Sequence, residues 1–137
     1  MSAMSRILFL SLFLAVLFPL AVFAADAPRP HLTFLEGFDD VPLMPGFHEL
    51  ADSLLIFDKP DGKIIQSEAC GAASWAAVRG FYTGALPQLG WRLEPASKGG
   101  QPQSLVFRRE GDRLEIGVGK ANLQHCSVKL RFSLTPE

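Results

Sequence analysis

The clearest pattern along the chain is an alternation of apolar and polar residues over residues 127–134. On one side fall Val128, Leu130, Phe132 and Leu134, and on the other Lys129, Arg131 and Ser133. A period of two is that of a strand with one buried and one solvated face. Shorter runs at 91–94, 104–109 and 113–119 are expected to be further strands, the last two joined by a tight turn at 110–112.

A second pair of strands is predicted earlier in the chain. Residues 54–57 and 64–68 are rich in apolar and β-branched side chains. Between them, residues 58–62 contain a proline that presets φ and a glycine that tolerates the left-handed region. This combination predicts a β-hairpin.

Between these two groups of strands the apolar period changes to that of a helix. Ser74 is a suitable N-cap, and apolar residues follow at spacings of three or four: Trp75, Val78, Tyr82, Ala85, Leu86 and Leu89. Pro87 should end the regular helix near Leu86. Gly90 can then turn the chain so that Trp91 starts the next strand and packs under the helix end.

The predicted order is therefore β-β-α-β-β-β-β, an α+β fold in which an antiparallel sheet packs against one main helix. Residues 25–37 are expected to form an extended lead-in, and residues 38–137 a single domain. Within the domain, Pro42 and Pro45 exclude a continuous helix at residues 38–47. Because this segment is also strongly apolar, we expect it to lie across the domain with its apolar side chains buried.

Residues 1–24 have the pattern of a secretory signal peptide. Arg6 precedes an apolar run at residues 7–23, and Val22-Phe23-Ala24 supplies a cleavage site. A retained membrane anchor is the alternative, although the run is at the short limit for a span and contains Pro19. We expect cleavage after Ala24, a periplasmic or secreted product, and no stable membrane span afterwards.

Charge and cysteine content narrow the expected partners and compartment. Without Arg6 the chain has 12 basic and 14 acidic residues, a net charge near −2, and the basic residues are scattered. This distribution argues against nucleic-acid binding, which requires concentrated positive charge. The two cysteines, Cys70 and Cys126, are expected to form a disulfide in an oxidising compartment. The alternatives are two unpaired structural thiols, and a metal-binding or reactive cysteine.

Two stretches together resemble a known group of proteins. Residues 40–46 match D-x-P-x-M-P-G and residues 81–91 match F-Y-x-x-x-L-P-x-x-G-W. Both are similar to motifs of small exported bacterial proteins of uncharacterised function, and the resemblance covers about residues 38–134. It implies an envelope location and an α+β fold, and it assigns no catalytic residues.

The sequence contains no convincing catalytic or metal-binding pattern. His31 falls in the expected tail and His48 and His125 in expected loops, and no nucleophile elbow is present. A mixed metal site of His48, Glu49, Asp52 and His125 has no familiar ligand spacing. We therefore expect no cofactor and no metal.

The remaining candidates are binding residues. Gly117 and Gly119 lie on one side of their strand, opposite Leu114, Ile116 and Val118, so a partner strand, the segment 38–47 or a ligand could approach there. The favoured hypothesis is a non-catalytic binding module for an envelope protein or cell-wall component. The alternatives are a carrier that holds a small apolar ligand near Met44, Tyr82 and Trp91, and a small hydrolase using His48 or His125.

For Trp91 itself, burial against the helix and the segment around Met44 is the main expectation. Its indole N–H would then donate to a carbonyl of the irregular segment 41–46. The alternative is that Trp91 lines a ligand cleft.

Overall fold

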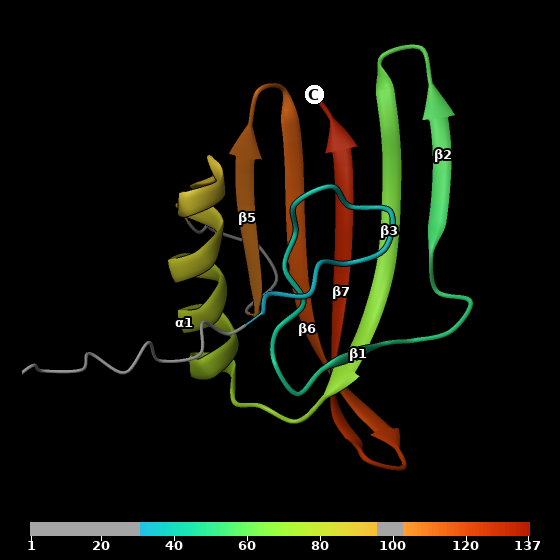
Figure 1. The fold of residues 1–137 in the computed structure, drawn as a ribbon, viewed down its shortest axis with the longest axis vertical. Coiled ribbons are helices and arrows are strands. Elements are labelled where there is room, and N and C mark those ends of the chain that lie inside the picture. Colours follow the sequence, from blue (N-terminus) through green and yellow to red (C-terminus); the bar gives the residue numbers. More distant parts are fainter. Residues whose placement is uncertain (1–30, 96–102) are drawn as a thin grey trace, which may run out of the picture. The chain divides into compact units, whose positions relative to one another are not determined.

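One antiparallel sheet and one α-helix make up the described part of the chain, residues 31–95 and 103–137 of a computed structural model (Figure 1). The elements are β1 (His48–Glu49), β2 (Leu55–Lys59), β3 (Gly62–Gly71), α1 (Trp75–Ala85), β4 (Arg92–Leu93), β5 (Ser104–Arg109), β6 (Asp112–Leu123) and β7 (Cys126–Pro136). The predicted α+β class is confirmed, and the predicted order is matched apart from β1. The expected signal peptide and residues 25–30 of the lead-in lie outside the described residues.

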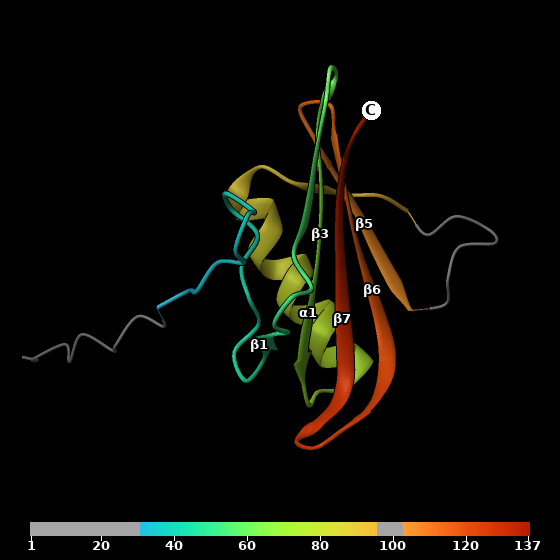
Figure 2. The ribbon, with the colours of Figure 1, turned by 90° about the vertical axis from the view of Figure 1, so that its right-hand side faces the viewer.

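The strands are ordered β1-β3-β7-β6-β5-β4, and β2 pairs with the same edge of β3 as β1 does. All pairings are antiparallel. Helix α1 and residues 31–47 lie on the same side of the sheet, and no described helix lies on the other side (Figure 2). We call this other side the helix-free face.

The alternation along the strands decides which side chains are buried. Leu130 and Phe132 of β7 are fully buried, whereas Arg131 between them is exposed. On the neighbouring strands, Leu114, Ile116 and Phe107 are also fully buried. The predicted division of the sheet into one buried and one solvated face is therefore confirmed.

Helix α1 begins and ends close to the predicted positions. The Ser74 hydroxyl caps it by accepting a hydrogen bond from the Ala77 N–H, at 3.1 Å. After Ala85 the chain tightens into a 3₁₀ turn, η1 (Leu86–Leu89), which Gly90 ends in the left-handed conformation, at φ 88°. The Trp91 N–H then donates to the Leu86 carbonyl, at 3.1 Å, so Trp91 belongs to this helix ending and β4 begins one residue later than predicted.

The apolar, proline-containing segment 38–47 packs its apolar side chains into or against the core, as predicted. Phe38, Val41 and Phe47 all belong to the core. A turn closed by a hydrogen bond from the Phe47 N–H to the Met44 carbonyl, at 3.0 Å, places Gly46 at φ 84°, as a proline–glycine turn requires.

Packing begins earlier than the predicted domain boundary at residue 38. Leu35 is only 2% exposed, its N–H donates to the Val41 carbonyl, at 2.9 Å, and Phe34 forms a β-bridge with Pro42. The compact unit starts at His31. Residues 31–37 are therefore part of the domain and not of an extended lead-in.

The close backbone approach in this fold occurs at Gly71. A Cβ there would lie 2.7 Å from the Phe47 ring and 2.8 Å from the Gly46 carbonyl oxygen. Only glycine therefore lets segment 38–47 lie against the end of β3. Directly before it, Cys70 pairs with His48 of β1.

Cys70 and Cys126 form a disulfide, as predicted, with their Cα atoms 5.5 Å apart. The bond joins the end of β3 to the start of β7, two strands that already pair along most of their length. Both cysteines are buried.

Candidate functional site

The residues proposed for an apolar ligand, Met44, Tyr82 and Trp91, lie in or against the core. Tyr82 is fully buried and Trp91 is 1% exposed, while Met44 is partly buried against the core to which both belong. The Tyr82 ring packs edge-on against Phe132, with ring centroids 5.9 Å apart. These contacts are those of core packing, so the prediction that Trp91 is buried is confirmed.

The polar environment of Trp91 differs from the prediction. Its Nε1 is buried without a hydrogen-bond partner among the described residues, so the expected bond to a carbonyl of segment 41–46 is wrong. The Arg109 guanidinium instead lies over the indole ring, 4.4 Å from its centroid. This is the geometry of a cation–π interaction.

Arg109 also connects the two sequence motifs. It forms an ion pair with Asp40 and donates a hydrogen bond to the Leu89 carbonyl, at 3.0 Å. Asp40 of the first motif and Trp91 of the second therefore meet through one arginine from β5. Sequence reasoning missed Arg109, because nothing local indicates which distant residues an arginine contacts.

The Tyr82 hydroxyl is a second buried polar group without a hydrogen-bond partner in the described part of the chain. Burial raises the pKa of Tyr82 above its usual value, and an interaction with the Met44 backbone works in the opposite direction. Because the raised pKa favours the neutral phenol in the folded state, its contribution to stability is complete below about pH 10 and is lost as the pH rises above that value.

The ionisation of Tyr82 can be followed by absorbance without overlap from other tyrosines, because Tyr82 is the only tyrosine in the chain. In an alkaline titration, tyrosinate absorbance should stay absent near pH 10 and appear together with the loss of circular dichroism. Tyr82→Phe should unfold at higher pH than the wild type. Tyrosinate forming near pH 10 while the native signal persists would show that the hydroxyl is accessible in the folded state.

The helix-free face carries the two glycines proposed as binding residues. Gly117 and Gly119 of β6 lie opposite Arg131 and Lys129 of β7. A Cβ at either glycine would meet no described atom within 4 Å. The expectation that segment 38–47 could approach the sheet here is wrong, since it approaches at Gly71 on the other face. Among the described residues, a strip of β6 at Gly117 and Gly119 therefore stays uncovered, and we call it the open strip.

Beside this strip lies a cluster of three charged side chains, Glu68, Lys129 and Arg131. The Glu68 carboxylate accepts hydrogen bonds from Lys129 Nζ and Arg131 Nε, each at 3.1 Å. Burial opposes ionisation of Glu68, but these bonds and charges outweigh it and lower its pKa. One carboxylate against two cations leaves the cluster with a net positive charge.

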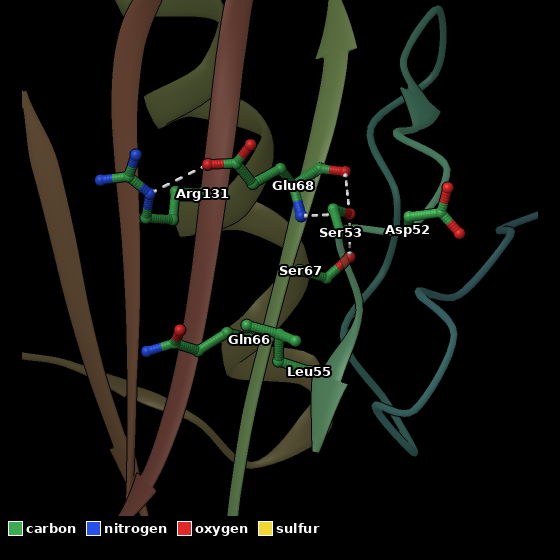
Figure 3. A pocket seen from close by; sticks show the side chains of 7 residues that line it. All are labelled: Asp52, Ser53, Leu55, Gln66, Ser67, Glu68 and Arg131. Atoms are coloured by element: carbon green, nitrogen blue, oxygen red, sulfur yellow. Dashed lines mark hydrogen bonds and ion pairs between the residues drawn. The ribbon is translucent and has the colours of Figure 1, made fainter. Parts of the chain in front are cut away.

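Arg131 uses only part of its hydrogen-bonding capacity in this cluster. Its bond to Glu68 involves Nε, and its two terminal nitrogens make no hydrogen bond to any described residue. In Figure 3 the guanidinium points away from Glu68, to the side on which β6 follows β7 in the sheet. Terminal guanidinium nitrogens are well suited to bind a carboxylate or phosphate in two-pronged fashion.

A pocket of about 230 Å³ lies at the edge of β3 where β1 and β2 pair, on the side of Glu68 away from β6 (Figure 3). Its lining residues are Asp52, Ser53, Leu55, Gln66, Ser67, Glu68 and Arg131. Met44, Tyr82 and Trp91 do not line it. The pocket arises where the chain between β1 and β2 departs from the edge of β3.

Ser53 holds this departing segment in place. Its hydroxyl accepts a hydrogen bond from the Glu68 N–H, at 3.0 Å, and donates to the Glu68 carbonyl, at 3.2 Å. The Leu50 N–H donates to the same carbonyl, at 2.8 Å. Sequence reasoning missed the pocket, because Ser53 and Ser67 are 14 residues apart and no spacing pattern connects them.

The histidines do not form a site with these residues. His48 lies in β1 and not in a loop as expected, and His125 occupies the turn between β6 and β7, at φ 65°. Neither lines the pocket. In residues 31–95 and 103–137, no group of three potential ligand residues is placed to hold a metal ion.

Comparison with known proteins adds no assignment to these residues. No protein-family model matches the chain, and no curated protein or solved structure shows significant similarity to it. Within the described ranges, no helix is long and apolar enough to cross a membrane.

Proposed function

We propose that the protein is an exported bacterial envelope protein that acts as a non-catalytic binding module through its helix-free face. The observation that carries this proposal is the open strip, where no described residue covers Gly117 and Gly119, beside Arg131, whose terminal nitrogens bind no described residue. Export rests on the expected signal peptide at residues 1–24, and the disulfide is compatible with it.

The chemistry of this face favours a flat ligand that bears an anionic group. The missing side chains of Gly117 and Gly119 allow a ligand to lie close to the sheet. A carboxylate or phosphate on such a ligand can pair with Arg131, in a cluster that already has net positive charge. In the envelope, a cell-wall component or an acidic segment of another protein presents such groups.

Two substitutions test this surface. Gly117→Leu fills the open strip, and Arg131→Gln removes the cation, so each should weaken binding to the isolated envelope fraction of the exporting host at least tenfold. Co-sedimentation measures the binding. For the wild type, added salt should also weaken it, because the pairing groups are exposed to solvent.

Two matched control variants distinguish loss of binding at the helix-free face from general damage to the fold. Gly80→Leu fills equally open space on helix α1, and Arg79→Gln removes an exposed cation from the same helix, away from the helix-free face. Both should bind as the wild type does. The proposal fails if Gly117→Leu and Arg131→Gln fold normally and still bind envelope material with unchanged affinity.

A further inference from the structure

Strand β2 forms an edge of the sheet, and its first three residues place exposed apolar side chains on both of its faces. Leu55 is 48% exposed, Ile56 48% and Phe57 53%. Strand β2 pairs with β3 on one side, and no other described strand pairs with it. Exposed apolar edge strands invite pairing with another chain, and proteins usually protect them with charge, proline or a bulge.

The backbone of β2 presents hydrogen-bonding groups at this free edge. On β3, the N–H and carbonyl of Glu68 both point to the β2 side, where Ser53 and Leu50 bind them. Gln66, two residues earlier, therefore also faces β2, and its partner is Leu55. Because such pairs alternate, Leu55, Phe57 and Lys59 turn their backbone groups to β3, while Ile56 and Asp58 turn theirs outward.

The apolar residues of β2 are complementary to a second copy of the same strand. If two copies pair antiparallel about Ile56, that residue lies opposite Ile56 of the other copy. Leu55 then lies opposite Phe57 of the other copy, and the reverse pair forms as well. Every exposed apolar side chain of β2 thereby meets an apolar partner, and the outward backbone groups of Ile56 form a hydrogen-bonded pair.

Other registers fit less well. Pairing about Phe57 places Ile56 opposite Asp58 and Leu55 opposite Lys59, so apolar side chains face charges. Pairing about Asp58 or about Lys59 places like charges opposite each other, which is destabilising.

We propose that the protein forms a two-fold symmetric dimer in which two copies of β2 pair antiparallel about Ile56. The contact is isologous and closes on itself, so it forms a dimer and not a fibre. The two sheets become one continuous sheet, with both helices on one side and both helix-free faces on the other. The dimer stands on the geometry of β2 alone and is independent of the ligand proposed for the helix-free face.

The first test is the oligomeric state in solution. Sedimentation velocity on the protein purified from its exporting host should show a monomer–dimer equilibrium that shifts to dimer as the concentration rises. Ile56→Lys should raise the dissociation constant at least tenfold, because two lysines would face each other across the two-fold axis. Leu123→Lys, which replaces a similarly exposed leucine at the end of β6, should dimerise as the wild type does.

The second test measures the register. Because residue 56 faces itself across the axis, Ile56→Cys should form an intermolecular disulfide under mild oxidation. Leu93→Cys, on the exposed edge strand β4, should form far less.

Three outcomes would overturn the dimer: a wild type that stays monomeric at every concentration, Ile56→Lys that dimerises normally, or equal cross-linking at positions 56 and 93. A monomeric wild type that captures an extended peptide on β2 also overturns it, since the edge then serves another partner. The two proposals are tested separately by these variants. Gly117→Leu should lose envelope binding and still dimerise, whereas Ile56→Lys should lose dimerisation and still bind the envelope fraction.

Discussion

Replacing Trp91 with alanine should lower the free energy of unfolding by about 3 to 5 kcal/mol, the range of large-to-small changes in protein cores. Trp91 is 1% exposed, so the substitution opens a cavity where the helix ending meets the sheet. It also removes the ring over which the Arg109 guanidinium lies. Because Arg109 also holds Asp40 and the Leu89 carbonyl, the loss should loosen the attachment of the N-terminal segment as well.

Chemical denaturation of Trp91→Ala beside the wild type measures this effect. Trp75→Ala is the matched control, because Trp75 is the other tryptophan of the chain and is only partly buried, so its loss should cost less. A change within about 1 kcal/mol for Trp91→Ala is what surface substitutions usually cause. That result would contradict the packing role of Trp91 and support the alternative that it lines a ligand site.

The elements with strong periodicity were predictable from the sequence. The alternation in β7 and the three-to-four spacing in α1 each depend on which face is buried, so they report the core directly. Ser74, Pro87 and Gly90 marked the helix boundaries for local stereochemical reasons. By contrast, β1 has two residues, too few for any period, and its pairing with β3 depends on Gly71 accepting the Phe47 ring.

The candidate site was predictable only in part. Gly117 and Gly119 could be assigned to one face of a strand, because alternation alone decides that. Their neighbours could not, since Glu68 is 61 and 63 residues from the two cations that it pairs with. Similarly, the register between β2 and β3 decides that the backbone groups of Ile56 point to the free edge of the sheet. A hairpin shifted by one residue would have turned them toward β3.

Removing the disulfide between Cys70 and Cys126 should lower the free energy of unfolding by about 4 kcal/mol. The bond closes a separation of 56 residues, and a cross-link of this length restricts the unfolded chain by that amount in the chain-entropy model. The native state should change little, because β3 and β7 remain paired over seven residue positions without the bond. The effect therefore belongs mainly to the unfolded state.

Urea denaturation of the protein with and without reductant measures this difference. The double variant Cys70→Ala with Cys126→Ala should match the reduced wild type within about 1 kcal/mol, and it avoids the free thiol that either single variant would leave. Reductant should not change the stability of the double variant, which controls for effects of the reductant itself. An unreduced wild type no more stable than the double variant would mean that the bond contributes nothing, so that strand pairing alone holds β3 against β7.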